Sequence, residues 1–354
     1  MVSRRGFGRA VIGIGISIVA LFLVVRSVDL AATWNTIITA QPQWIAAMVA
    51  FMVIDIGLRA LRWRVLLRPV ADVPFRQTLP ANLVGYLANN ILPARLGELV
   101  RTDDLGARSG VPRSTILGTI VVERVVDTVV LVAIASIAIL VLSVRGIVAS
   151  AVLVGLAVTA LLIVAIAIGI AAHRLPGAER VATFLDRWPQ VREMLARLRE
   201  GLTIATKAGT IGRALVLTFL AWGCAILAFT AGAQAVGIQP TMGQAALLAA
   251  GTNLATAIPA APGYVGTFEL AAVTIGASVG ISRDDALAMA VLVHGFSLLL
   301  TSIGGAIAFA LGPRRRHATA DAAAAAATAA TAHNEADGVP ASATRDEVAT
   351  SKGA

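Results

Sequence analysis

Long apolar segments constrain this chain more than any other feature of its sequence. Of its 354 residues, 57% are hydrophobic and 14% are charged, whereas soluble domains carry about 25% charged residues. So little charge cannot cover the surface of a soluble globule, so soluble enzymes are excluded. A membrane-spanning helix needs about 20 largely apolar residues. Six segments meet that length, namely 8–26, 43–67, 114–142, 147–172, 213–237 and 286–311.

Two further apolar stretches, 77–110 and 242–281, are interrupted by proline and glycine. They come into register when the chain is shifted by 166 positions, and both contain the pattern G-x7-P-A-x-x-G. The identical spacing without gaps indicates a duplication with copies at about 43–142 and 213–311, although chance agreement is the alternative in so apolar a chain. The matched residues are Pro74, Gly85, Pro93, Ala94 and Gly97 with Pro240, Gly251, Pro259, Ala260 and Gly263.

The basic residues predict the topology, because cytoplasmic loops of membrane proteins are enriched in Lys and Arg. If both broken stretches enter and return on one side, 25 of the 29 basic residues face the cytoplasm, and Arg26, Arg145 and Arg283 face outside. If both stretches crossed fully, the basic segment 174–213 would change sides. The sequence therefore predicts an all-α, polytopic protein of the cytoplasmic membrane, with about six spanning helices, two re-entrant broken-helix hairpins in inverted repeats and both termini cytoplasmic.

Inverted repeats with broken helices are typical of secondary transporters, whose substrate site lies between the repeats. The prolines fit the first turn of a second half-helix. The N-termini of two half-helices would then meet near mid-membrane and offer free N–H groups to a phosphate or carboxylate. The alternative is a proline kink with packing glycines. The predicted hairpin tips comprise Pro93, Gly97, Pro259, Pro262 and Gly263.

The second half of the first hairpin carries several charged residues, whereas that of the second hairpin is apolar apart from Glu269. Arg95, Glu98 and Arg101 are spaced i, i+3, i+6 and share one helical face, and Asn90 lies just before the tip. Arginine forks bind phosphate oxygens in pairs, so this face is predicted to hold a lipid headgroup, with Glu98 orienting the arginines or pairing with a cationic group. The alternative is an interfacial helix whose arginines snorkel to the headgroups.

Charged residues also lie inside predicted spans. Glu123, Arg124 and Asp127 lie in span 114–142, and Asp55 and His294 reach similar depth in their own helices. Such residues normally face the bundle interior or a cavity. They form either a polar lining for the substrate or an ion-pair cluster that locks helices together. A proton relay through Asp55, Glu123 and His294 is a weaker hypothesis.

Two segments lie outside this membrane core. Residues 176–208 have apolar residues at helical spacing with arginines on the other faces, which predicts an amphipathic helix in the headgroup layer. Residues 313–354 lack large apolar residues and are predicted to form a disordered cytoplasmic tail. Either segment could instead dock a partner protein.

Several catalytic signatures are absent from the sequence: it has no H-E-x-x-H, no G-x-S-x-G, no Walker A motif and no Cys/His cluster. We therefore predict no metal, no cofactor and no enzyme activity. The net charge of +9 is interpreted as a topology signal rather than as a nucleic-acid interface.

Three segments carry a resemblance to a known family: residues 90–101 (N-I-L-P-A-R-L-G-E-L-V-R), 123–127 (E-R-V-V-D) and 261–269 (A-P-G-Y-V-G-T-F-E). From about residue 8 to 312 the chain resembles the transmembrane domain of lysylphosphatidylglycerol synthases and their stand-alone flippase-like relatives. The resemblance implies a domain that moves aminoacylated phosphatidylglycerol across the bilayer, while a separate cytosolic domain synthesises it. That synthase activity is not carried over to this chain. The polar positions of the family correspond to Arg95, Glu98, Arg101, Glu123, Arg124, Asp127 and Glu269.

The leading hypothesis is a translocase for an anionic or aminoacylated phospholipid or a polyprenyl-phosphate lipid. One alternative is a membrane scaffold that binds lipid and assists a separate lipid-modifying enzyme. Another is a proton-coupled transporter of a small anion.

Overall fold

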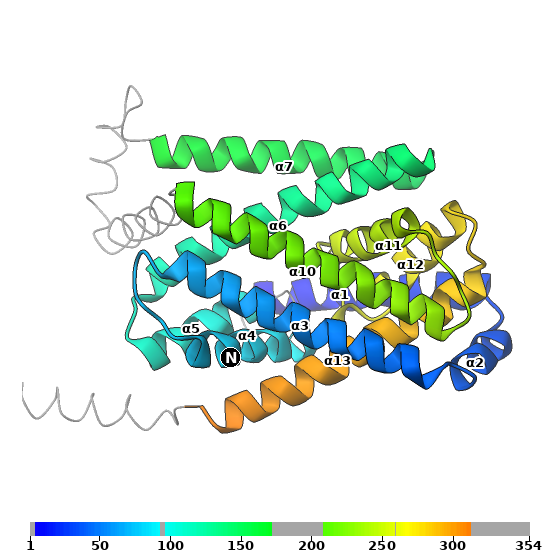
Figure 1. The fold of residues 1–354 in the computed structure, drawn as a ribbon, viewed down its shortest axis with the longest axis horizontal. Helices are drawn as coiled ribbons and strands as arrows, with labels where there is room; N and C mark the ends of the chain where they lie inside the picture. Colours follow the sequence, from blue (N-terminus) through cyan, green and yellow to red (C-terminus); the bar gives the residue numbers. More distant parts are fainter. Residues whose placement is uncertain (1–3, 93–95, 172–207, 259, 313–354) are drawn as a thin grey trace, which may run out of the picture. The chain divides into compact units, whose positions relative to one another are not determined.

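The computed structural model describes residues 4–92, 96–171, 208–258 and 260–312. Within these ranges the chain forms eleven α-helices and one 3₁₀ turn, and no strand (Figure 1). The all-helical class predicted from the sequence is therefore confirmed. The predicted amphipathic helix 176–208 and the predicted tail 313–354 lie outside the described residues, except for Ala208, which is the first residue of α10.

Four of the described helices are long and apolar enough to cross a membrane: α3 (Pro42–Leu67), α6 (Arg113–Leu142), α10 (Ala208–Ala235) and α13 (Arg283–Ala310). They match four of the six predicted spans. α7 (Ile147–Ala171) follows a fifth, but its apolar stretch with described side chains is limited to Ile147–Leu161. The described residues thus contain four candidate spans, or five if the bent pair below forms one.

The predicted N-terminal segment 8–26 lies within one helix, and the chain bends sharply after it into a short helix that was not predicted. α1 (Arg4–Ser27) is followed by α2 (Leu30–Ile38) at an angle of 88°. The side chain of Asp29 accepts hydrogen bonds from the N–H groups of Ala31 and Ala32, which caps the start of α2. This short helix is missed by a search for long apolar segments.

Each of the two broken stretches folds back on itself. The first forms α4 (Phe75–Ile91) and α5 (Gly97–Ser109), which pack together. A Cβ atom at Gly97 would lie 2.2 Å from the carbonyl oxygen of Gly85, so only glycine allows these two backbones to approach so closely. The second stretch forms α11 (Met242–Ala255) and α12 (Thr267–Ser278), which also pack together.

The tip of the second hairpin corrects one prediction. Pro262 does not start the second half-helix; it starts the 3₁₀ turn η3 (Pro262–Tyr264), and α12 begins only at Thr267. The physical reason is backbone conformation, since Gly263 and Gly266 have φ values of 68° and 87° and interrupt the helix. Two other predicted tip residues, Pro93 and Pro259, lie outside the described residues.

The bounds of the helices recur with the 166-residue shift of the sequence pattern. This shift carries α3 onto residues 208–233, where α10 begins at Ala208 and ends at Ala235. It carries α4 onto 241–257, where α11 covers Met242–Ala255. The two predicted copies therefore share one order of elements, namely a long helix, a broken hairpin and a second long helix, and the duplication itself stays a prediction.

The two copies interlock along the antiparallel helices α3 and α10, which lie side by side (Figure 1). The N–H of Gln41, before α3, donates to the carbonyl oxygen of Ala235 at the end of α10. At the opposite end, Leu66 shares an apolar cluster with Ala214. In addition, α4 packs on α13 while α11 packs on α6, so the hairpin of each copy contacts the last helix of the other.

Candidate functional site

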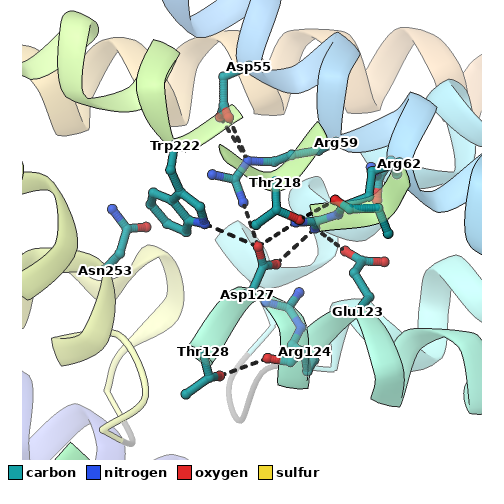
Figure 2. Close-up of polar contacts among 12 residues, drawn as sticks. Asp55, Arg59, Arg62, Glu123, Arg124, Asp127, Thr128, Thr218, Trp222 and Asn253 are labelled. Carbon is teal, nitrogen blue, oxygen red and sulfur yellow. Dashed lines mark hydrogen bonds and ion pairs between the residues drawn. The ribbon is translucent and has the colours of Figure 1, made fainter. Parts of the chain in front are cut away.

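A network of buried charges connects α3, α5 and α6. Arg62 of α3, which is 0% exposed, donates to both carboxylate oxygens of Asp127 (2.5 and 2.8 Å) and to Glu123 (2.9 Å). Both acids lie on α6, four residues apart and on one face, so a single guanidinium reaches both (Figure 2). We refer to six residues together as the network: Asp55, Arg59, Arg62, Arg101, Glu123 and Asp127.

Arg101 of α5 closes one end of the network. It is 3% exposed and donates to Glu123 (3.2 Å) and to the side-chain oxygen of Asn82 (2.7 Å). Its guanidinium lies 4.8 Å from the centre of the Trp63 ring. The predicted residues Arg101 and Glu123 are thus in direct contact, and Arg101 points into the bundle rather than toward headgroups.

Arg59 of α3 forms the other end, next to a tryptophan. Its Nε lies 2.9 Å from both oxygens of Asp55, and its guanidinium lies 4.4 Å from the Trp222 ring centre. Trp222 in turn donates its indole N–H to Asp127 (3.2 Å, Figure 2). Three arginines and three carboxylates thus meet in this network, so its formal charge is zero.

Of the five residues in the ion-pair cluster that the sequence left open as an alternative, Asp55, Glu123 and Asp127 lie in this network, whereas Arg124 and His294 pair elsewhere. Removing one partner of such a buried pair is strongly destabilising, because the other charge stays buried without compensation. Sequence reasoning missed Arg59 and Arg62, since it counted both as cytoplasmic loop charges. Their spacing was the available signal: with Asp55 they lie at i, i+4 and i+7 on one face of α3.

Arg124 and Glu98 form a separate pair. They are 3.0 Å apart, and their side chains are 38% and 19% exposed. Arg124 is adjacent to Glu123 in the sequence but does not join the network. The predicted headgroup-binding face of the first hairpin is therefore divided, with Arg101 buried, Glu98 partly accessible and Arg95 outside the described residues.

A cavity of about 120 Å³, lined by both polar and apolar side chains, lies beside the network. Its walls come from both copies: α3 of the first, and α10, α11, α12 and α13 of the second. Asp55 and His294 of the predicted relay line this cavity, whereas Glu123 does not, because it lies farther away in the network. Asn253 is a lining residue that sequence reasoning missed. The polar and aromatic lining comprises Asp55, Arg59, Trp222, Phe229, Asn253, Phe268, His294 and Ser297.

Glu269 and His294 form a buried pair at the wall of this cavity. His294 Nδ1 lies 2.6 Å from Glu269 Oε1, and the other carboxylate oxygen accepts the N–H of Gly266 (2.6 Å). The ring of Phe268 stacks on the imidazole with centroids 4.3 Å apart. The sequence singled out both residues, but their pairing across 25 positions was not predicted.

Backbone N–H groups that were predicted to be free at the hairpin tips are hydrogen-bonded. Asn89 accepts the N–H of Gly97 at the start of α5 (2.8 Å), and Glu269 accepts the N–H of Gly266 at the start of α12. The prediction of free N–H groups is wrong for these two residues, because side chains of the hairpins already cap them. Asn90 donates to the hydroxyls of Thr301 and Ser302, both at 2.9 Å, and so fixes the first tip to α13.

Among the described residues, no group of three or more His, Cys, Asp and Glu side chains could hold a metal ion. The cavity beside the network is lined by α3, α10 and α13 together with α11 and α12 of the second broken hairpin. The predicted absence of enzyme activity and cofactors stays a prediction.

Comparisons with known proteins agree with the resemblance seen in the sequence. The family model for the lysylphosphatidylglycerol synthase TM region matches residues 10–305. Glycosyltransferase AglD of Haloferax volcanii is 25% identical over 333 aligned residues, which cover 83% of this chain and 53% of that protein. A UPF0104 membrane protein of Methanothermobacter thermautotrophicus is 29% identical over 128 residues, covering 35% of this chain and 38% of that protein. The chain thus spans about half the length of AglD.

Proposed function

This chain belongs to the lysylphosphatidylglycerol synthase TM region family, and from that premise we propose that it is a lipid translocase. It moves a lipid with an anionic headgroup across the cytoplasmic membrane, with both of its termini on the cytoplasmic side. The headgroup passes through the polar cavity while the acyl chains stay in the bilayer.

The observation that carries this proposal is the position of the cavity between the two copies. Its lining combines Asp55 and Arg59 of the first copy with Asn253 and His294 of the second. The antiparallel packing of α3 on α10 supports an inverted repeat, the architecture in which transporters hold substrate between repeats. A charged headgroup would be costly in hydrocarbon, and such a lining lowers that cost.

The predicted substrate residues take different roles in this proposal. Glu98 and Arg124 form a partly exposed pair and are proposed to meet the headgroup on its way in. Arg101, Glu123 and Asp127 are paired with one another or with Arg62, and we infer that they hold the helices that frame the path. Arg95 and Glu269 remain candidate headgroup contacts.

The test is headgroup scrambling in liposomes that contain the purified protein and a fluorescent anionic phospholipid. Ala225 lines the cavity, so Ala225→Leu fills part of it and is expected to slow scrambling at least tenfold. The matched control is Ala306→Leu on the exposed face of α13, which should retain the wild-type rate within about twofold. Equal rates for both variants, or no rate above that of empty liposomes, would reject the proposal.

A second candidate is a membrane partner of a separate lipid-modifying enzyme. The observation that favours it is AglD, a protein named for glycosyl transfer that joins a region similar to this chain to about as much chain again. Proximity labelling in cells, with and without residues 313–354, tests it. A partner of this kind should be lost with that deletion, whereas a translocase without the segment should still scramble lipid.

A further inference from the structure

We propose that Glu269 and His294 form a proton-binding pair, and that an anionic lipid headgroup enters the adjoining cavity together with one proton on His294. The inference rests on the proposed function and deepens it by naming the coupling ion.

The hydrogen bonds of Glu269 define which nitrogen of His294 is available. One carboxylate oxygen of Glu269 accepts the N–H of Gly266, and the other faces Nδ1 of His294. An ionised carboxylate only accepts, so Nδ1 carries a hydrogen and donates it to Glu269. The neutral imidazole then has its lone pair on Nε2, and its ring lines the cavity.

One proton changes what this ring offers to the cavity. Neutral His294 presents a lone pair at Nε2, which repels an anionic oxygen. A proton from water that adds to Nε2 leaves the Nδ1–H bond in place and turns Nε2 into a charged donor. When the proton leaves to water on the other side, the anion loses its donor and is released.

The charge balance around the cavity also favours the entry of a proton together with the anion. The network has formal charge zero, since each of its three arginines is matched by a carboxylate. Asp55 is held by Arg59 at 2.9 Å. With neutral His294, Glu269 adds one uncompensated negative charge next to the cavity, and an entering anion would be the second. Protonation of His294 removes that charge, and at low dielectric this difference is large.

The other charged and titratable groups near the cavity are few. α1, which packs on α12, has no titratable residue from Gly13 to Val25, and the lining residue from α11 is the uncharged Asn253. Asp55 and Arg59 of α3 line the cavity, and the groups that interact with either of them are Arg62 of α3, Tyr86 of α4, Asp127 of α6 and Cys224 of α10. Asp55 and Asp127 already bind arginine, which leaves the Glu269–His294 pair as the proton site.

Proton uptake by the purified wild-type protein in detergent tests the inference directly. In weakly buffered solution, adding dioctanoyl phosphatidylglycerol should draw up to one proton per protein from the medium. Dioctanoyl phosphatidylcholine, which has no net charge, should draw none. The affinity for the anionic lipid should fall about tenfold per pH unit once the free pair is deprotonated, because one proton is linked to binding. Binding of the anionic lipid without proton uptake would overturn the inference.

Two variants assign the proton to this pair. His294→Gln and Glu269→Gln should each lose the proton uptake and flatten the pH dependence of lipid affinity to less than twofold per unit. Ala306→Leu serves as the control and should keep both. Binding of phosphatidylcholine and the melting temperature report whether each variant is folded. Proton uptake that persists in His294→Gln would show that another group binds the proton, and so refute the assignment.

The outcomes separate this inference from the proposed function. Scrambling of anionic lipid without linked protons refutes the coupling and leaves the translocase intact. Proton-linked binding of phosphatidylglycerol without scrambling refutes the translocase and leaves the proton site intact. If inorganic phosphate alone drew the same proton with similar affinity, the site would belong to a free anion, and the lipid assignment would be wrong.

Discussion

The two predicted copies, residues 43–142 and 213–311, place charge in opposite ways. Among the described residues, the buried charged side chains of the first copy are Arg62, Arg101, Glu123 and Asp127, which compensate one another. The buried ionisable side chains of the second copy are Glu269 and His294. Arginine stays protonated at every accessible pH, whereas an imidazole can bind or release a proton. One copy therefore has a fixed charge pattern, and the other can respond to protons.

The difference indicates a division of labour between copies of one architecture. Fixed, mutually paired charges hold α3, α5 and α6 in one arrangement. The Glu269–His294 pair joins α12 to α13 instead, and its His294 lines the cavity. If the first copy acts as the frame and the second as the responsive part, substitutions in the two copies should lower stability to different extents.

The largest effect is expected from Asp127→Asn in the frame. The substitution removes the carboxylate that binds Arg62 and lies 3.9 Å from Arg59, and so leaves buried guanidinium charge uncompensated. We expect a loss of about 3–5 kcal/mol of stability, measured by thermal unfolding in detergent.

Its counterpart in the second copy is Glu269→Gln. Because neutral His294 can retain a hydrogen bond to the amide, this variant should lose only about 1–2 kcal/mol. Equal destabilisation by the two substitutions would remove the proposed contrast between a fixed and a responsive copy.

The next effect comes from the glycines that close the two hairpins. Alanine at Gly97 would put Cβ 2.2 Å from the backbone oxygen of Gly85, which cannot move away without opening α4 from α5. We expect a loss of about 3 kcal/mol or more, the upper range for overpacking, with a drop in folded yield by size-exclusion chromatography.

Gly251 of the second hairpin is the matched control. Its Cβ would meet the Cδ1 atom of Ile275 at 2.4 Å, the far end of a flexible side chain. Gly251→Ala should therefore cost about 1 kcal/mol, within the lower range for overpacking. If Gly251→Ala were the more damaging variant, the tighter closure of the first hairpin would be disproved.

The membrane helices could be predicted from the sequence because each depends on a local property. A run of about 20 apolar residues spans a bilayer whatever its neighbours are, so α3, α6, α10 and α13 lie close to the predicted segments. The short helix α2 has no such run, and its start depends on the side chain of Asp29.

The site was less predictable because its pairings depend on tertiary structure. Counting basic residues assigned Arg59 and Arg62 to the cytoplasmic side, a rule that does not distinguish an interfacial arginine from one that faces acids on another helix. Glu123 and Asp127 were identified by their depth in α6, but Arg62 as their partner comes from a helix about 60 positions away. The cap that Glu269 provides for Gly266 likewise required the conformation of the tip.

A smaller effect is expected at the pair that lies outside the network. Glu98 and Arg124 are 3.0 Å apart but partly exposed, so their attraction is weakened by solvent. The coupling energy from a double-mutant cycle of Glu98→Gln and Arg124→Gln should be about 0.5–1 kcal/mol. A coupling above about 3 kcal/mol would mean that this pair belongs energetically to the network.

The smallest effect is expected from Arg113→Gln at the start of α6. Its Nε lies 2.6 Å from Asp103, a separation as short as those in the network, but the two side chains are 62% and 46% exposed. Because both charges keep most of their hydration and are screened by salt, the loss should be below about 0.5 kcal/mol and should shrink further in 0.5 M salt. The melting temperature of Arg113→Gln at low and high salt measures it. A large, salt-independent loss would show that separation rather than burial determines the strength of these pairs, and would contradict the reasoning that ranks Asp127→Asn first.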